Sequence, residues 1–300
     1  MINSKKTPKI IVRIKGGLGN QLFAYAAARR LALVNNAELV IDDVTGFSRD
    51  YQYKRQYALN NFKIESRTAT PAERLEPFER YRRRAIQWRA RQQAFSHKSY
   101  VEQEGTDFDN RLLTLAVKKT VYLDGYWQSE KYFKDIQATI RKDLQIVTPQ
   151  SLETNRIALE INNCNAVALH VRWFEHDSTT ATYNLAADYY QKAIALIEQK
   201  IDLPHYFLFS DNPAAAMNKI TLPENRVTFV NHNRGDENAY ADLWLMSQCQ
   251  NFITANSTFS WWGAWLSDYQ RKIVISPKIE LDGVAAWGFD GLIPPEWTEL

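Results

Sequence analysis

Two side chains that can bind an anion stand at the end of an apolar run in the second half of the chain. The stretch ALHVRWFEHD, residues 168–177, passes from apolar residues to His170 and Arg172 and then to aromatic and ionisable side chains. Charged groups are rarely buried unless something pairs with them. Arginine has a planar fork that binds phosphate oxygens in pairs. The pattern therefore predicts either the rim of a fold or a site for a charged ligand.

A second polar group stands where a strand is expected to pass into a helix, in the stretch ANSTFSWW. Asn256, Ser257 and Thr258 would lie at the helix N-terminus, where backbone N–H groups and hydroxyls bind anions. The same residue types are common helix caps, so ordinary capping is the structural alternative. If this helix start and Arg172 lie at neighbouring strand ends, they converge on a diphosphate. No acidic pair is placed for a divalent ion, so we expect no metal.

The third candidate is a glycine turn, GGLGN, at Gly16–Asn20. It follows an expected strand and opens an expected helix, and Asp42 comes about twenty residues later, as in a dinucleotide-binding fingerprint. The third glycine of that motif would fall at Leu22, and the Gly-Lys-Ser/Thr of a P-loop is absent, so an NAD enzyme is the weaker alternative. The remaining interpretation is a turn that lets a ligand approach the backbone closely. Asn20 and Gln21 then provide amide side chains at the start of the helix. A simple tight turn between strand and helix is the structural alternative.

The elements that would position these residues alternate between strand and helix. In the first half, β-branched runs predict strands at 9–14, 37–42 and 118–127, and helical spacing predicts helices at 21–36 and 129–144. The region from Asp43 to about Asp109 shows no strand alternation. Its middle, residues 79–93, has helical propensity and many arginines.

The second half alternates more regularly. Strands are predicted at 165–171, 205–211, 226–230, 251–255 and 272–276, with helices at 188–200, 237–249 and 257–269 and a short one beginning at Pro213. This alternation predicts parallel sheets covered on both faces. With Thr148–Gln150 as the boundary, we expect an α/β protein of two Rossmann-like domains, 1–149 and 150–300, facing across a cleft. Return of the C-terminal tail to the first domain is left open. Ligands would bind beyond the carboxyl ends of the strands.

Composition excludes several classes of protein. The 300 residues are 45% hydrophobic and have a net charge of +3, which does not by itself indicate a nucleic-acid partner. Cys164 and Cys249 form neither a disulfide framework nor a zinc motif. Because no signal-peptide core and no membrane-spanning run are visible, we expect a soluble cytoplasmic protein. Nine tryptophans indicate a large aromatic core or, alternatively, a site that stacks on sugars.

The arginine-rich segment 79–93 allows two interpretations. We favour a solvated helix, and the alternative is a basic helix that binds a membrane surface or RNA. Binding to a membrane would bring an intracellular protein to lipid-linked molecules. The segment therefore allows at most peripheral contact with the inner membrane.

Several motifs, in this order along the chain, resemble the α-1,2-fucosyltransferases of glycosyltransferase family 11. They are GGLGNQLFAYAAARRLA, LDGYWQSEKYF, the His-x-Arg strand, FLFSDNP and DLWLMSQCQNFITANSTFSWWGAWL. The match covers most of the chain and is weakest from Asp43 to about Arg111. The resemblance implies a GT-B fold and metal-independent, inverting transfer of L-fucose from GDP-β-L-fucose, with no cofactor. The acceptor would be the 2-hydroxyl of a terminal galactose on a glycan.

The resemblance also implies roles for single residues. Arg172 would contact the diphosphate with His170 beside it, and Asn20 would reach the fucose or the acceptor from the facing domain. The remaining donor-side positions are Ser257 and Thr258 on phosphate oxygens with Asn256 beside them, Asp242 on the guanine, and Asp211 on the nucleoside.

The chain departs from the family pattern after the first arginine. The usual motif continues Arg-Gly-Asp-Tyr, whereas here Trp173 replaces the second arginine and the Gly-Asp pair is missing. Any role that needs two arginines or that aspartate is in doubt. Among the residues that follow, Glu175 and then Asp177 are our candidates for the general base, with Asp42 as a rival, and a transition state that needs no strong base is the alternative. A transferase of another linkage and an inactive sugar-nucleotide-binding module also stay open.

Overall fold

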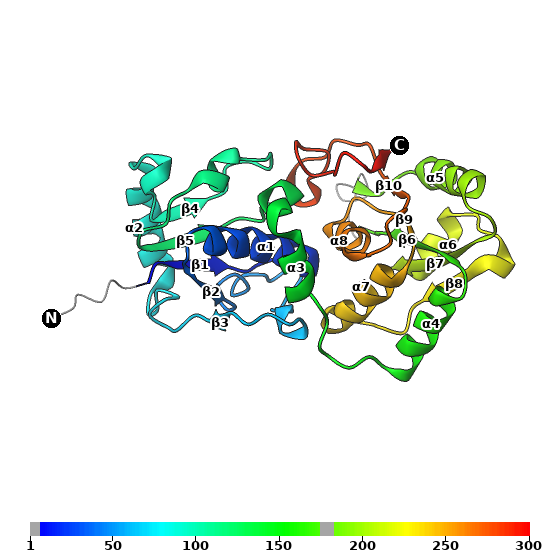
Figure 1. The fold of residues 1–300 in the computed structure, drawn as a ribbon, viewed down its shortest axis with the longest axis horizontal. Helices are drawn as coiled ribbons and strands as arrows, with labels where there is room; N and C mark the ends of the chain where they lie inside the picture. Colours follow the sequence, from blue (N-terminus) through cyan, green and yellow to red (C-terminus); the bar gives the residue numbers. More distant parts are fainter. Residues whose placement is uncertain (1–6, 175–182) are drawn as a thin grey trace. The chain divides into compact units, whose positions relative to one another are not determined.

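Every pair of neighbouring strands in the two described sheets runs parallel. The structure is a computed structural model that describes residues 7–174 and 183–300 (Figure 1). The chain divides into two units. One comprises the residues up to Val147 with Asp290–Leu292, and the other comprises Thr148–Phe289 with Ile293–Leu300. Each unit contains one of the sheets, as strands alternating with helices predict.

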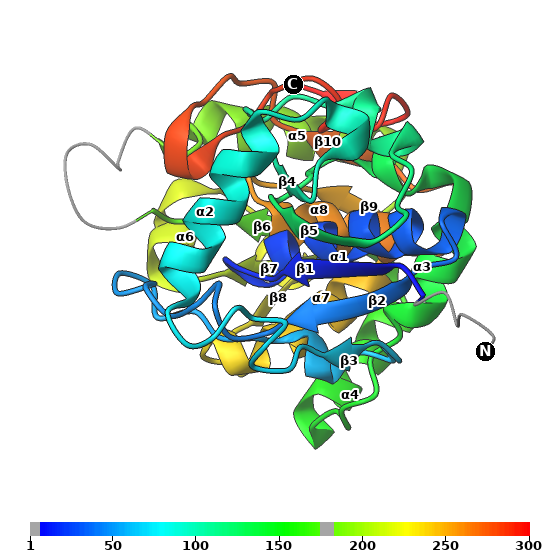
Figure 2. The same ribbon diagram turned by 90° about the vertical axis from the view of Figure 1, so that its left-hand side faces the viewer.

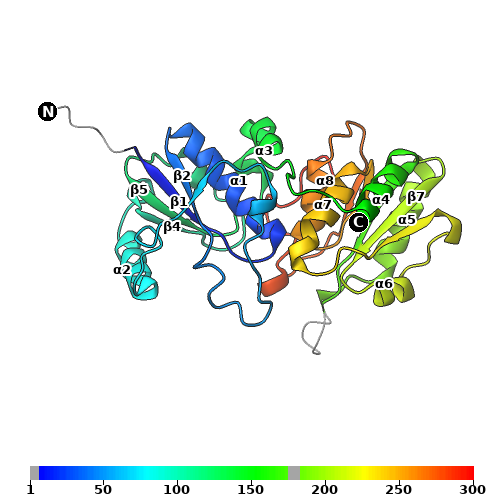
Figure 3. The ribbon, with the colours of Figure 1, turned by 90° about the horizontal axis from the view of Figure 1, so that it is seen from below.

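The first unit is built on a five-stranded sheet in the order β3-β2-β1-β5-β4. Its strands are β1 (Lys9–Arg13), β2 (Glu38–Asp42), β3 (Arg67–Thr68), β4 (Tyr100–Glu102) and β5 (Thr120–Asp124). Its helices are α1 (Leu18–Val34), α2 (Glu79–Arg91) and α3 (Gln137–Asp143). Helices α1 and α3 lie on one side of the sheet and α2 on the other (Figure 3).

Two expectations for this unit were wrong. Strands β3 and β4 occur within the region that shows no alternation, because strands of two and three residues are too short to display a period. The helix expected at 129–144 is broken. Two 3₁₀ turns, Glu130–Tyr132 and Lys134–Ile136, come before α3.

The second unit has a six-stranded sheet in the order β11-β10-β9-β6-β7-β8. Its strands are β6 (Asn165–Val171), β7 (Pro204–Ser210), β8 (Val227–Val230), β9 (Asn251–Ile253), β10 (Val274–Ser276) and β11 (Thr298–Glu299). Its helices are α4 (Leu152–Asn162), α5 (Ala187–Lys200), α6 (Pro213–Lys219), α7 (Ala239–Gln248) and α8 (Thr258–Leu266). The sequence did not lead us to expect α4 or β11.

The order of the strands decides which face each helix covers. From β6 the chain steps outward to β7 and β8, then crosses back to β9 and β10. Because such crossovers are right-handed, the reversal places α5 and α6 on one face and α7 and α8 on the other. Helix α4 packs with α7 on this second face (Figure 3). A strand order that reverses in this way is the point at which open α/β sheets bind ligands.

Most tryptophans of the second unit lie in the core, whereas Trp173 and Trp244 are partly exposed. The side chains of Trp261 and Trp262 are fully buried, and Trp265 and Trp297 nearly so. The Trp261 ring lies 5.1 Å from that of Trp262, 6.2 Å from that of Trp265 and 5.5 Å from that of Trp297. Aromatic pairs in this range add to the stabilisation from burial. This indole cluster packs α8 against the C-terminal segment.

Replacing Trp261 with alanine should destabilise the second unit by about 3–5 kcal/mol, because it removes the central ring of the indole cluster and leaves a cavity. Calorimetric unfolding measures the effect. Trp88→Ala is the matched control, since that indole is 66% exposed and its loss should change stability by less than about 0.5 kcal/mol. Equal effects of the two substitutions would contradict the assignment of Trp261 to the core.

Candidate active site

Four adjacent strands of the second sheet deliver the expected donor-side residues to one edge. The sheet order places β9, β6, β7 and β8 side by side, all parallel. Beyond their carboxyl ends follow, in that spatial order, Asn256–Thr258, Arg172, Asp211 and the first turn of α7, which contains Asp242. Parallel strands end at a common edge, so the topology gathers these residues at one side of the sheet.

Arg172 has a carboxylate partner within this edge. Its guanidinium Nη1 forms an ion pair with Oδ2 of Asp211, and the second oxygen of Asp211 accepts a hydrogen bond of 2.8 Å from the backbone N–H of Trp173. The guanidinium also lies over the ring of Phe174, 5.1 Å from its centroid. The arginine is about one quarter exposed. Asp211 therefore orients an arginine that a ligand can still reach.

His170 is a neutral, buried neighbour of Arg172. Burial, and then the positive charge of Arg172, lower the pKa of His170 to about 3. Its ring lies 5.8 Å from that of Phe259 on α8, and its Nδ1 has no hydrogen-bond partner among the described residues. Because the imidazole is neutral at ordinary pH, Arg172 supplies the positive charge at this strand end.

The start of α8 has the features expected of an anion-binding helix terminus. Ser257 is the N-cap, and its Oγ accepts a hydrogen bond of 3.3 Å from the N–H of Phe259. Thr258 is the first residue of the helix. The amide of Asn256 donates to the carbonyl of Tyr183 at 2.9 Å, while its Oδ1 has no partner among the residues described. Capping and anion binding are thus compatible here, since free N–H groups remain at a helix start.

Asp242 is a partly buried carboxyl group with one hydrogen-bond partner among the described residues. Asn233 donates a hydrogen bond of 2.8 Å to its Oδ1. Burial raises the pKa of Asp242 to about 7, and the bond from Asn233 opposes this only in part. A carboxyl group with such a pKa is poised to ionise when a ligand offers N–H donors.

The chain on either side of residues 175–182 is tied together. Asn184 accepts a hydrogen bond of 2.8 Å from the N–H of Phe174 and donates one of 3.2 Å to its carbonyl. The rings of Phe174 and Tyr183 meet edge to face with centroids 5.8 Å apart. Two of the expected site residues, Glu175 and Asp177, lie outside the described residues.

In the first unit, the glycine turn is held by amide side chains. Gln21 is buried, donates to the carbonyls of Gly16 at 2.9 Å and Gln56 at 2.8 Å, and accepts from the N–H of Ala58 at 2.9 Å. Gln128 donates to Oδ1 of Asn20 at 2.8 Å. Gln21 therefore serves the fold, whereas Asn20 is partly exposed at the helix start.

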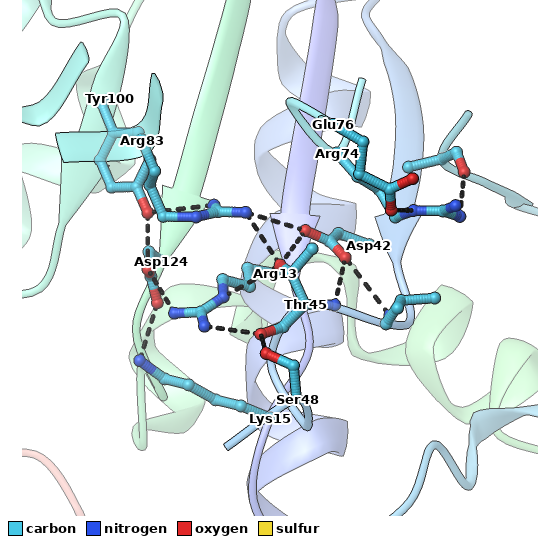
Figure 4. Close-up of polar contacts among 12 residues, drawn as sticks. Arg13, Lys15, Asp42, Thr45, Ser48, Arg74, Glu76, Arg83, Tyr100 and Asp124 are labelled. Carbon is cyan, nitrogen blue, oxygen red and sulfur yellow. Dashed lines mark hydrogen bonds and ion pairs between the residues drawn. The ribbon is translucent and has the colours of Figure 1, made fainter. Parts of the chain in front are cut away.

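Asp42 belongs to a buried polar network beside this turn (Figure 4). Its carboxylate accepts hydrogen bonds from the N–H of Val44 at 3.3 Å and from the N–H and hydroxyl of Thr45 at 2.9 and 2.5 Å. Arg83 of α2 reaches it at 3.3 Å and Thr45 Oγ1 at 2.8 Å. These contacts make Asp42 the cap of the turn after β2 and the partner of Arg83. It is therefore poorly placed to take a proton from an incoming hydroxyl.

Asp124, at the end of β5, completes the network. It pairs with Lys15 at 2.7 Å and Arg13 at 3.2 Å, and the hydroxyl of Tyr100 donates to it at 2.6 Å. Burial alone would raise the pKa of Asp124, but Lys15 and Arg13 outweigh it and lower that pKa to about 2. Since Arg83 also contacts Tyr100 at 3.3 Å, the carboxyl ends of β1, β2 and β5 are joined to α2.

Sequence reasoning missed most of these supporting residues. Arg83 looked like one arginine among six, although it is the inward-facing member of α2. Asn184 and Asn233 carry no motif of their own.

Across residues 7–174 and 183–300, no group of three or more His, Cys, Asp or Glu side chains is arranged to hold a metal ion, and no helix is long and apolar enough to span a bilayer. Both cysteines are free thiols.

Arg83→Ala should destabilise the first unit by about 3–5 kcal/mol, because it leaves the buried carboxylate of Asp42 without its cation. Arg84→Ala, the adjacent change on the exposed face of α2, should cost less than about 0.5 kcal/mol. Denaturant unfolding followed by circular dichroism compares the two. If Arg83→Ala is as mild as Arg84→Ala, the network does not anchor α2.

Comparison with known sequences places this site in a family. The profile of "Glycosyl transferase family 11" matches residues 9–298. The chain is 27% identical over 300 residues to an Escherichia coli alpha-1,2-colitosyltransferase, an alignment that covers 97% of this chain and 98% of that protein. It is 32% identical over 284 residues to the E. coli O-antigen biosynthesis glycosyltransferase WbnK, covering 88% and 92%.

Comparison with solved structures concerns the fold. A mutant of Arabidopsis thaliana FUT1 in complex with GDP has a TM-score of 0.54 at 13% identity, covering 94% of this chain and 72% of that one. POFUT1 in complex with GDP-fucose has a TM-score of 0.51 at 13% identity, covering 90% and 97%. The two parallel-sheet α/β domains are thus those of a GT-B fold, as expected. Because the family profile matches almost the whole sequence and a relative is 32% identical over most of it, this chain belongs to glycosyl transferase family 11.

Proposed function

We propose that this glycosyltransferase transfers L-fucose from GDP-β-L-fucose to the 2-hydroxyl of a terminal galactose, forming an α-1,2 linkage. The observation that carries the proposal is the convergence of Arg172, Asp242 and the start of α8 at one edge of the second sheet. A GDP-sugar needs a carboxylate to bind its guanine, and a cation and N–H donors to bind its diphosphate. Family membership supplies the reaction class.

Arg172 and α8 would hold the diphosphate. Arg172 would exchange its pairing with Asp211 for phosphate oxygens, and the N–H groups and hydroxyls at Ser257 and Thr258 would bind the same anion. As the bond to fucose breaks, negative charge develops on the leaving GDP. Donors fixed in place before the reaction stabilise that charge most effectively. We therefore propose that the chain needs neither a metal ion nor a cofactor.

The sugar would be transferred in a single displacement. The donor is a β-glycoside and the proposed product an α-glycoside, so the acceptor hydroxyl attacks the face opposite the leaving GDP. That hydroxyl must lose a proton, and a general base typically accelerates this by about 10²–10⁴-fold. Glu175, and after it Asp177, remain our candidates for the base. An oxocarbenium-like transition state with late loss of the proton remains the alternative.

A second donor is favoured by one relative. Because one match is a colitosyltransferase, we also consider transfer of colitose, the sugar that lacks the 3-hydroxyl of fucose. A site that forms hydrogen bonds with this hydroxyl rejects the deoxy sugar by about 10⁴–10⁵-fold, whereas an apolar site discriminates only weakly. The ratio of kcat/KM for the two donors therefore distinguishes the candidates.

The deciding experiment incubates the protein with GDP-fucose or GDP-colitose and a panel of β-galactosides, with EDTA present. Product linkage is determined by NMR and GDP release is measured in parallel. An α-1,2-fucosyl galactoside formed in EDTA supports the proposal. Another linkage would contradict the proposed product, and a strong preference for GDP-colitose would contradict the proposed donor. A requirement for added magnesium or manganese would contradict metal-independent transfer. Binding without turnover would show that the chain is not an active transferase.

Arg172→Ala should lower kcat at least about tenfold, because a charged hydrogen bond to phosphate contributes roughly 1.5–3 kcal/mol, and by more because this bond strengthens as GDP leaves. Arg172→Lys should recover little, since lysine keeps the charge but not the fork. The matched control is Arg156→Ala on α4, whose arginine forms ion pairs with Glu153 and Glu160 of its own helix. Near-normal kcat in Arg172→Lys would contradict bidentate binding.

Binding of GDP should strengthen as the pH rises from 6 to 8. The pKa of Asp242 is raised to about 7 in the free protein, and the ionised carboxylate is the form that accepts hydrogen bonds from guanine. Guanine binding would favour ionisation, so about tenfold tighter binding is expected at pH 8 than at pH 6. Asp242→Asn should bind weakly and lose this part of the pH dependence.

Isothermal titration calorimetry on both proteins makes the comparison. The titration of the phosphates of GDP contributes equally to the two profiles, so their difference isolates Asp242. Identical pH profiles would show that Asp242 does not contact the base.

A further inference from the structure

Helix α2 concentrates positive charge that has no role in the proposed transfer reaction. Residues 79–93 contain six arginines and one glutamate, whereas the whole chain has a net charge of only +3. The helix lies beside β4 in the first unit (Figures 1 and 2). Its charge is therefore a local feature of one surface.

The rotation of α2 about its axis is fixed by its buried side. Arg83 and Ala90, two turns apart on one face, are its buried residues. Arg83 is held by Asp42, Thr45 and Tyr100 in the polar network (Figure 4). With this face turned inward, the opposite face must point to solvent.

Aromatic side chains occupy the centre of that outer face. Tyr81 is 68% exposed and Trp88 is 66% exposed, and they are seven residues apart, so they lie in line along the helix. Phe78, just before the helix, is 72% exposed. At 100° per residue, Arg80 and Arg84 fall on one side of this line and two further arginines, Arg82 and Arg89, on the other.

The arginines on this surface are poorly neutralised. Within the described parts of the chain, Arg80, Arg84 and Arg89 make no ion pair and no side-chain hydrogen bond. The guanidinium of Arg82 donates hydrogen bonds to the backbone carbonyls of Leu75 and Glu76. Arg91 pairs with Glu102 at 3.4 Å, where both side chains are largely exposed. The outer face therefore presents a positive potential with exposed rings at its centre.

We propose that the outer face of α2 docks on an anionic lipid bilayer. Tyrosine and tryptophan rings prefer the headgroup region of a membrane, and arginines beside them bind lipid phosphates. On this face a row of aromatic rings lies between two rows of arginines. The rings can insert toward the apolar interior of the bilayer while the arginines bind the anionic headgroups. RNA would need rings that stack on single bases within a groove, whereas this face is a single exposed helix. The charge pattern therefore favours the lipid surface.

The test is sedimentation of the full chain with vesicles. Vesicles of phosphatidylcholine alone are compared with vesicles that contain one third phosphatidylglycerol, at low and high salt. Each arginine near an anionic surface strengthens partitioning by about fivefold. We expect binding only to the anionic vesicles, weakened by salt because screening shortens the range of the attraction.

Two variants separate charge from aromatic insertion. Tyr81→Ser with Trp88→Ser removes the rings, and Arg80→Gln with Arg84→Gln and Arg89→Gln removes the unpaired charges. Each variant should lower the vesicle partition coefficient at least about tenfold and leave turnover of a water-soluble acceptor unchanged.

Matched controls change the same chemistry elsewhere on the surface. Tyr51→Ser with Leu152→Ser removes two exposed apolar side chains, and Lys63→Gln with Lys118→Gln and Lys119→Gln removes three exposed charges. Both controls should bind vesicles like the unaltered chain. Circular dichroism verifies that all variants fold.

Several outcomes would overturn the proposal. They are no binding to anionic vesicles, equal binding to neutral ones, or equal losses in the α2 variants and the controls. Tight binding of single-stranded RNA without vesicle binding would assign the face to nucleic acid. A dimer in light scattering that the Tyr81 and Trp88 substitutions dissociate, again without vesicle binding, would assign it to a second copy of the chain.

Discussion

The parallel pairing of β6 with both β7 and β9 is the constraint on which the proposed donor site depends. Leu169 aligns with Leu208 on one side and Ile253 on the other, so the three strands end at one edge. Residues separated by more than eighty positions in the sequence thereby become neighbours. A shift of register by one residue would turn each side chain to the other face of the sheet. The fully buried apolar residues of β6 oppose such a shift.

The charged side chains at the strand ends are more completely paired in the first unit than in the second. In the first, the charges of Arg13, Arg83, Asp42 and Asp124 are largely satisfied by one another, and the network holds a turn and a helix in place. In the second, Arg172 has one carboxylate partner and Asp242 has no cation partner in the described structure. Buried or half-buried groups with incomplete pairing are typical of ligand sites, because the ligand supplies the missing charge or donor.

How much the sequence predicts depends on the length and regularity of each element. The long strands of the second sheet and helices α1, α5, α7 and α8 are evident from apolar periodicity, and Pro213 marks the start of α6. Strands β3 and β4 escape prediction because they contain two and three residues. The Ser151 cap and the spacing of Ile157 and Ile161 indicate α4, but from this region we predicted only the domain boundary at Thr148–Gln150.

The sequence predicts which residues form the candidate site, but not how they pair with one another. Motifs pointed to Arg172, Ser257 and Asp242, whereas the pairing of Arg172 with Asp211 depends on strand order, which spacing does not encode. Similarly, nothing in the arginine run singles out Arg83 until α2 is seen to pack on β4. Pairings between distant strands are a property of the assembled sheet.

The indole cluster behind α8 has a consequence for how this enzyme can diversify. Because the buried rings of Trp261, Trp262 and Trp265 pack against one another on the inner side of this helix, Ser257 and Thr258 are held in place, and the proposed binding of a diphosphate there would cost little ordering entropy. The same close packing means that most amino-acid substitutions on the buried side of α8 would destabilise it. Relatives that use another sugar would therefore keep the proposed diphosphate site unchanged and differ in the loops around it.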